Sequence, residues 1–166
     1  MQINISNLAQ GIHTYSLEVA PADLEIQQHF TSVIKAEVTL DKSVHQILLE
    51  VWIPGVEGHF LCDRCVEEFS RIITCSYRKV YVSREIDGVA FNGDEIEIIS
   101  PDMNIIDLSN DVRDEILLAI PLKLLCREDC AGLCSRCGKN LNTGQCDCAP
   151  APTDSRWEAL ARLRDN

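Results

Sequence analysis

The sequence predicts an α+β fold: an antiparallel sheet that could close into a barrel, one core helix, a cysteine-rich tail and a C-terminal helix. Three observations lead to this prediction. Runs rich in β-branched and aromatic residues fill the region 29–82, and a helical period of apolar residues follows residue 109. Eight of the nine cysteines form four closely spaced pairs, three of them after residue 125. Sheet, helix and tail therefore follow one another along the chain.

The length of 166 residues suits one domain with a small appendage rather than two full domains. Hydrophobic residues make up 46% and charged residues 25% of the chain, which excludes a disordered or fibrous protein. We place a sheet domain at 1–125, a cysteine-rich segment at 126–148, and a linker with a helix at 149–166. The linker is indicated by Ala149-Pro150-Ala151-Pro152, whose prolines favour extended backbone.

Three strands are predicted in the first half of the chain, at 29–40, 43–53 and 72–82, where Val, Ile, Thr and Tyr are frequent. The dipeptides Asp41-Lys42 and Pro54-Gly55 are turn signals beside these strands. Strands that are joined by short turns pair antiparallel, so this region predicts a meander.

A further hairpin is predicted at 88–100. The apolar run Val89-Ala90-Phe91 is followed by Asn92-Gly93, a dipeptide that favours a two-residue hairpin turn. In the second run, 95–99, residues 95–98 alternate between acidic and apolar side chains, as in a strand with one buried face.

Two helices are predicted. In the first, Ser109 serves as the N-cap and Pro121 ends the helical pattern. Its apolar face, which should pack on the sheet, consists of Val112, Ile116, Leu117 and Ile120. In the second, Ser155 and Glu158 form a capping box near the C-terminus.

The formal net charge of −11 disfavours contact with a phosphate backbone and favours basic partners. Ten acids and two arginines lie between Arg84 and Glu115, a stretch that reads as solvated surface or as a docking face for a basic protein. The chain has neither a run of about 20 apolar residues nor a basic and apolar leader, so we expect a cytoplasmic protein. In that reducing compartment, paired thiols indicate metal ligands or redox groups rather than disulfides.

The strongest motif is Cys134-Ser-Arg-Cys137-Gly138, followed by Cys146-Asp-Cys148. A two-residue gap lets both sulfurs of a turn face one ion, and the glycine relieves crowding where the backbone turns. This pattern is typical of a structural zinc site, although the closing Cys-x-Cys is tighter than a usual second knuckle.

A second set combines Cys62-Asp-Arg-Cys65 with Cys126-Arg-Glu-Asp-Cys130. Each pair supplies two ligands, so together they complete a tetrahedral site that would clip the tail to the sheet. The alternative groups Cys126 and Cys130 with Cys134 and Cys137, and leaves the outer pairs idle or redox active. We prefer two full sites, hence two structural zinc ions, because that grouping uses eight of the nine cysteines.

No catalytic residue is predicted. The acids lie in polar runs without an acid–base pair, and the chain has no phosphate loop, nucleophile elbow or His-Glu-x-x-His helix. A site with four cysteine ligands also leaves no open position for catalysis by zinc. Cys75 is interpreted as a buried free thiol, and among the histidines only His59 lies near a cysteine pair.

The chain resembles the YceD family, the large ribosomal RNA subunit accumulation proteins of bacteria and plastids. The resemblance extends from about residue 60 to the end of the chain. It is carried by Cys62-x-Arg64-Cys65 with Phe69, Asp107-Leu108, the run Asp-Glu-Ile-Leu-Leu-Ala-Ile-Pro at 114–121, Cys126 to Cys130, Gly132-Leu133-Cys134-x-x-Cys137-Gly138-x-Asn140-Leu141-Asn142, and Cys146-x-Cys148.

The resemblance implies a non-enzymatic ribosome biogenesis factor that acts in the synthesis, processing or stability of 23S ribosomal RNA. It also favours grouping Cys62 and Cys65 with Cys126 and Cys130. The charge of −11 directs the expected contact to a large-subunit precursor or a basic ribosomal protein. Two other functions are kept: a zinc-ribbon nucleic-acid binder that uses Arg136 and Lys139, and a thiol redox switch that releases zinc on oxidation.

Overall fold

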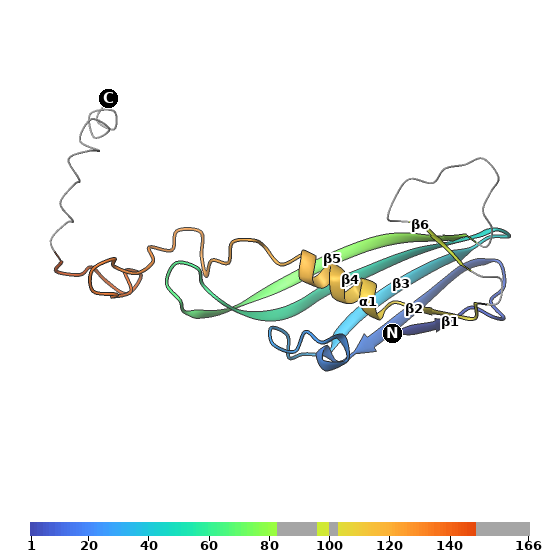
Figure 1. Ribbon diagram of the computed structural model, residues 1–166, viewed down its shortest axis with the longest axis horizontal. Helices are drawn as coiled ribbons and strands as arrows, with labels where there is room; N and C mark the ends of the chain where they lie inside the picture. The colour runs from blue at the N-terminus through green and yellow to red at the C-terminus, as the bar shows by residue number, and fades with distance from the viewer. Residues whose placement is uncertain (83–95, 100–102, 149–166) are drawn as a thin grey trace, which may run out of the picture.

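The computed structural model describes residues 1–82, 96–99 and 103–148. These residues form mostly strands, with one α-helix and one 3-10 turn (Figure 1). In chain order the elements are β1 (Gln2–Asn4), β2 (Gly11–Val19), η1 (Pro21–Leu24), β3 (Ile34–Lys42), β4 (Gln46–Leu61), β5 (Glu68–Val82), β6 (Ile96–Ile98), β7 (Ile105–Asp107) and α1 (Ser109–Leu118). None of the helices in the described ranges is long and apolar enough to cross a membrane.

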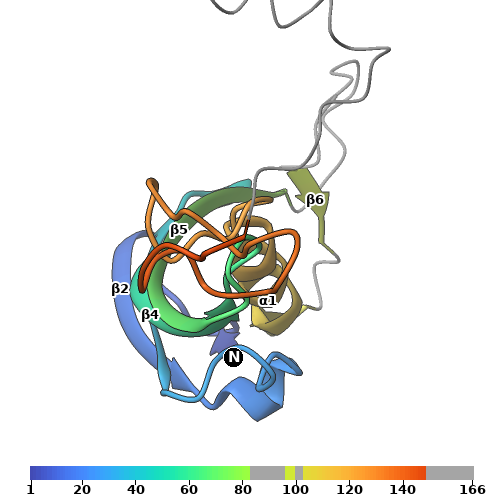
Figure 2. The ribbon, with the colours of Figure 1, turned by 90° about the vertical axis from the view of Figure 1, so that its left-hand side faces the viewer.

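The main sheet has five strands in the order β2-β3-β4-β5-β6. The first four form an antiparallel meander, of which β3, β4 and β5 were predicted and β2 was not, whereas β6 pairs parallel to β5. β1 pairs with β7 in a separate two-stranded sheet. The main sheet curls strongly (Figure 2), but β2 and β6 do not pair with each other, so the expected barrel does not close within the described residues.

The core lies on one face of the curled sheet. Alternate residues of β3 and β4 point into it, because successive side chains of a strand face opposite sides. From α1 the side chains of Val112 and Ile116 are fully buried in the same cluster. Other members of this core are Ile34, Ala36, Val38, Leu40, Leu49, Val51 and Ile53.

The turn predicted at Pro54-Gly55 is wrong. Both residues lie inside β4, where the pairing with β5 shifts register between Ile53 and Val56. Proline has no N–H to donate to the neighbouring strand, so within a strand it is tolerated at an irregularity of this kind. In sequence, a proline and glycine at a bulge look the same as a turn. As a result the β4–β5 hairpin continues as far as Leu61 and Glu68, and its tip extends beyond the rest of the sheet (Figure 1).

The structure also differs from two other predicted boundaries. Asp41 and Lys42 end β3, and the turn follows at Ser43, whose N–H donates to the carbonyl of Gln46 at 2.9 Å. Ser109 is not the N-cap: it is the first residue of α1, and the amino group of Met1 donates to its hydroxyl. The Asn92-Gly93 hairpin turn and the helix beginning near Ser155 fall outside the described residues.

Candidate metal centre

The tip of the β4–β5 hairpin is a tight knuckle of six residues, Cys62 to Glu67. The N–H of Cys62 donates to the carbonyl of Glu67, and the N–H of Val66 donates to the carbonyl of Cys62, both at 2.9 Å. Val66 has a φ of 59°, a left-handed conformation that a β-branched residue rarely adopts. This turn directs the sulfurs of Cys62 and Cys65 to one side.

The tail contains a second copy of the same knuckle, from Cys134 to Lys139. The N–H of Cys134 donates to the carbonyl of Lys139, and the N–H of Gly138 donates to the carbonyl of Cys134, again at 2.9 Å. Gly138 has a φ of 71° and occupies the position of Val66. The sequences Cys62-Asp-Arg-Cys65 and Cys134-Ser-Arg-Cys137 therefore form one structural motif twice.

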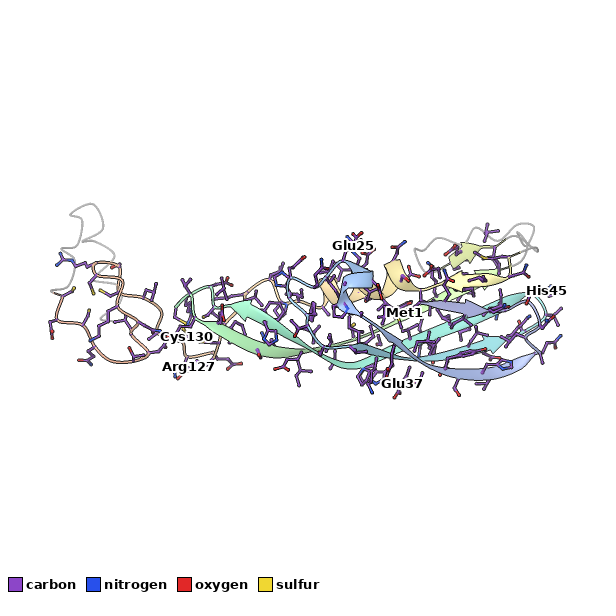
Figure 3. All side chains as sticks on the ribbon, turned by 90° about the horizontal axis from the view of Figure 1, so that it is seen from below. Met1, Glu25, Glu37, His45, Arg127 and Cys130 are labelled. Carbon is purple, nitrogen blue, oxygen red and sulfur yellow. The ribbon has the colours of Figure 1, made fainter. Side chains whose placement is uncertain are left out.

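After α1 the tail runs to the hairpin tip (Figure 3). It docks there through backbone and side-chain hydrogen bonds. The N–H of Asp63 donates to the carbonyl of Leu124 at 2.8 Å, and the N–H of Leu124 donates back to Asp63 Oδ2 at 2.6 Å. Arg64 Nη1 donates to the carbonyl of Cys130 at 2.8 Å. A Cβ at Gly132 would lie 3.1 Å from the carbonyl oxygen of Arg64, so glycine permits this approach.

Docking brings Cys62 and Cys65 together with Cys126 and Cys130, and we call these four thiols the first cluster. Their sulfurs all lie within 4.8 Å of one another, and no disulfide joins them. The Cys62–Cys130 distance is 3.8 Å and the Cys65–Cys126 distance is 3.7 Å. Sulfurs about 2.3 Å from a tetrahedral zinc ion lie about 3.8 Å apart, so the spacing fits that ion.

The second cluster consists of Cys134, Cys137, Cys146 and Cys148, whose sulfurs also lie within 4.8 Å of one another. The distance between Cys146 Sγ and Cys134 Sγ is 3.4 Å, somewhat shorter than a zinc tetrahedron requires. Cys137 is exposed and the other three are half-buried, whereas three thiols of the first cluster are buried. The structure thus forms the preferred grouping and not the alternative of Cys126 and Cys130 with Cys134 and Cys137.

In each cluster at least one thiol has a lowered pKa and at least one has a raised pKa. Burial raises the pKa of Cys62, but hydrogen bonds from the amides of Cys126, Cys65 and Arg64 outweigh it and lower the pKa to about 6. The backbone amides around Cys137 and Arg136 lower the pKa of Cys134 to about 6. The pKa is raised to about 12 for Cys126, chiefly by burial, and for Cys148, chiefly by its contact with Cys137.

These donor sets suit a structural ion. Four thiols fill a tetrahedral shell and leave no position for water or substrate. A bound ion would supply charge that lets all four sulfurs ionise together, and it would cross-link the segments that carry them. In the first cluster the linked segments are the hairpin tip and the tail.

Asn142 is a residue of this region that sequence reasoning did not single out as functional. Its side-chain Nδ2 donates to Cys130 Sγ at 3.3 Å, and this hydrogen bond is the largest cause of the lowered pKa of Cys130. Its only sequence signal was its place in the run that follows Gly138. Asparagine is common in loops, so that signal was weak.

The remaining predicted residues lie apart from both clusters or are engaged elsewhere. Cys75 belongs to neither cluster, and burial raises the pKa of its thiol to about 11. His59 is hydrogen-bonded to Ser70 at 3.0 Å. Lys139 Nζ donates to the carbonyl of Gln145 at 2.7 Å, whereas the guanidinium of Arg136 contacts no partner among the described residues.

A family model described as "Large ribosomal RNA subunit accumulation protein YceD" matches residues 57–164. Two curated relatives are chloroplastic proteins named "Large ribosomal RNA subunit accumulation protein YCED homolog 1", from Arabidopsis thaliana and Zea mays. The first is 37% identical over 65 residues, which cover 39% of this chain and 20% of the relative. The second is 50% identical over 46 residues, which cover 27% of this chain and 16% of the relative.

The chain thus spans at most a fifth of the length of either relative. No solved structure matches it. The residues matched by the family model include the hairpin knuckle, the docked tail and both clusters. Because that match covers well over half of the sequence, the chain belongs to the YceD family.

Proposed function

We propose that the chain is a non-enzymatic factor for the accumulation of large-subunit ribosomal RNA, acting in the synthesis, processing or stability of 23S ribosomal RNA. The observation that carries this proposal is the family match over residues 57–164, which takes in all eight clustered cysteines. The family and both relatives are named for accumulation of that RNA rather than for a reaction.

In this proposal both clusters hold zinc, and the ions are structural. Support comes from the four-thiol donor sets and from sulfur spacings near those of a zinc tetrahedron. The ion of the first cluster keeps the tail docked on the hairpin tip. The protein then offers a fixed surface to its partner instead of two independently moving parts.

The proposed partner is a basic ribosomal protein of the large-subunit precursor, because the chain carries a net charge of −11. A cleft of about 710 Å³ beside α1 is lined by more acidic than basic side chains, so it is also negatively charged. Of its acids, Glu37, Asp114 and Glu115 form no ion pair with any described residue. Trp52, 47% exposed, lines the same cleft and offers a face for a cationic side chain.

The functional test is removal of the gene from the organism that encodes this chain. We expect a lower ratio of large-subunit to small-subunit ribosomal RNA, with precursor forms of the large-subunit RNA retained. The wild-type chain and Cys75→Ser should restore the ratio, since Cys75 lies outside both clusters. Cys62→Ser should not. An unchanged ratio in the deletion strain would contradict the proposed function.

The partner is tested by capturing the tagged chain from growing cells at low and at high salt. A basic ribosomal protein that remains attached at low salt, together with large-subunit precursor RNA, would support the protein contact. Direct binding of purified RNA with a steep salt dependence would instead favour the nucleic-acid binder. In that case Arg136→Ala should weaken RNA binding, since this guanidinium forms no hydrogen bond or ion pair with the described residues. Lys139→Ala should weaken RNA binding and also destabilise the knuckle, because it removes the hydrogen bond to the carbonyl of Gln145.

A further inference from the structure

Asn142 belongs to the second cluster by sequence and contacts the first cluster in space. It lies in the loop between Cys137 and Cys146, whose sulfurs both face the second site. Nevertheless its Nδ2 donates to the sulfur of Cys130 at 3.3 Å. This side chain therefore connects the two groups of thiols.

The orientation of the Asn142 amide is fixed by two donors to its oxygen. Oδ1 accepts the N–H of Ala131 at 2.8 Å and Arg127 Nη2 at 2.7 Å. A flipped amide would place its NH₂ group against these two donors. The NH₂ group is therefore directed to Cys130 Sγ, one of the four sulfurs that face the first site.

The position of Asn142 depends on the loop that carries it. The N–H of Leu141 donates to the carbonyl of Gly132 at 2.8 Å, and the N–H of Asn142 donates to Asn140 Oδ1 at 2.9 Å. An ion in the second cluster would join both ends of this loop, because Cys134 and Cys137 precede it and Cys146 and Cys148 follow it. Without that ion, no cross-link restrains the loop, and its few hydrogen bonds alone must hold Asn142 in place.

We propose that Asn142 couples metal binding at the two clusters, so that an ion in the second raises the affinity of the first. Coupling of this kind is reciprocal, so an ion in the first cluster raises the affinity of the second equally. The inference rests on the zinc binding included in the proposed function. Loss of an outer hydrogen bond to a metal ligand weakens binding by about 10- to 100-fold, and we expect a change of that size.

The test measures zinc affinity of each cluster separately in the full chain. Free zinc is fixed by a chelator buffer, and mass spectrometry follows the protection of each cysteine against an alkylating reagent. In the wild-type chain, Cys126 and Cys130 should become half-protected at a free zinc concentration about tenfold lower than in the double variant Cys146→Ser and Cys148→Ser, which lacks the second site.

Asn142→Asp identifies the residue that carries the coupling. It keeps the size and the accepting oxygen but loses the donor to Cys130, so Cys126 and Cys130 should need about tenfold more zinc. In the Asn142→Asp background, loss of the second site should have no further effect on the first. A residue with a purely structural role would lower both affinities without removing this dependence. Gln145→Ala is the matched control, because this side chain lies on the same loop and forms no hydrogen bond or ion pair with the described residues.

Two results would overturn the coupling. One is equal half-protection of Cys126 and Cys130 with and without the second site, and the other is coupling that persists in Asn142→Asp. A distinct result, in which zinc protects no cysteine of either cluster at any concentration, would refute the proposed zinc binding itself and the coupling with it.

Discussion

The two clusters contain the same knuckle in different surroundings. At the hairpin tip, Cys65 lies beside Cys126, which is 61 positions further along the chain, and three of the four thiols are buried. In the tail, Cys134 lies beside Cys146, which is only 12 positions further along the chain, and none of the four thiols is buried. A local turn thus serves once to join distant segments and once to fold a short segment on itself.

The energetics of loop closure sharpen this difference. A simple cross-link over 61 residues contributes about 4 kcal/mol, and one over 12 residues contributes about 3 kcal/mol. The two values are similar because the entropy of a loop grows slowly with its length. The clusters therefore differ less in how strongly an ion stabilises them than in which parts of the protein that ion holds together.

The largest expected effect is that of Cys62→Ser. It should remove one of two zinc ions and lower the free energy of unfolding of the sheet and tail by about 4 kcal/mol. Cys146→Ser should also remove one ion but lower the stability of the sheet by only about 1.4 kcal/mol, which corresponds to the tenfold loss of zinc affinity expected at the first cluster. Trp52 on β4 reports unfolding by fluorescence in a Trp157→Phe background.

Cys75→Ser is the control for that comparison, and it should retain both ions because Cys75 is in neither cluster. If Cys146→Ser destabilised the sheet as much as Cys62→Ser, the second cluster would stabilise the sheet as strongly as the first, and the difference between the two clusters would be refuted.

Acid should release zinc from both clusters. The pKa of Cys62 and that of Cys134 are lowered from the usual 9.0 to about 6 in the folded chain. Because the folded value lies below the unfolded one, each thiolate contributes stability that is complete above pH 9.0, declines as the pH falls, and is lost below about pH 6.

The measurement for this pH dependence uses Cys146→Ser and Cys62→Ser, which each retain one intact cluster, and a dye that detects released zinc. We expect zinc to be retained at pH 7 and released as the pH falls further, because protons compete with the ion for the thiolates. The second cluster should release its ion at the higher pH, since its thiols are more exposed. Equal release curves would contradict this order.

Val66 and Gly138 occupy the same left-handed position of the two knuckles, and replacing each with the other residue should have opposite effects on stability. Val66→Gly relieves a conformation that costs a β-branched residue about 1–2 kcal/mol, so unfolding by urea should shift to higher concentration. Gly138→Val should lower zinc affinity of the second cluster by about tenfold, since a Cβ has room there and only the φ of 71° opposes it. Destabilisation by Val66→Gly would mean that the exposed Val66 side chain itself makes a needed contact.

The smallest effect is expected for the arginines at the shared third position of each knuckle. Arg64→Ala removes hydrogen bonds to the carbonyls of Cys130 and Glu128 and should weaken docking of the tail by about 1–2 kcal/mol. Arg136→Ala should change stability by less than about 0.5 kcal/mol. Hydrogen exchange of the Asp63 and Leu124 amides, which pair hairpin and tail, measures the docking. If these amides were equally protected from exchange in Arg64→Ala and Arg136→Ala, Arg64 would have no role in docking the tail.

The strands β3, β4 and β5 could be predicted because Val, Ile, Thr and Tyr are frequent in them. β2 was not predicted, since polar side chains such as His13 and Tyr15 occupy its inner positions. The barrel was wrong because residue composition indicates strands and says nothing of whether edge strands meet.

The cysteine grouping was accessible to sequence reasoning because four ligands complete a zinc shell, and of the two groupings weighed only one placed eight thiols in two full sites. The equivalence of the two knuckles was not accessible, because valine at position 66 does not suggest a left-handed turn. Neither was the role of Asn142, which depends on the donors that orient its amide.

The separation of Cys65 from Cys126 has a consequence for the chain while it is being synthesised. The hairpin leaves the ribosome with two thiols in place, and about 60 more residues must follow before its site has four. The second cluster, by contrast, is complete as soon as its own short segment has emerged. Capture of an ion by the first cluster thus marks a chain whose sheet, helix and docked tail have all been made.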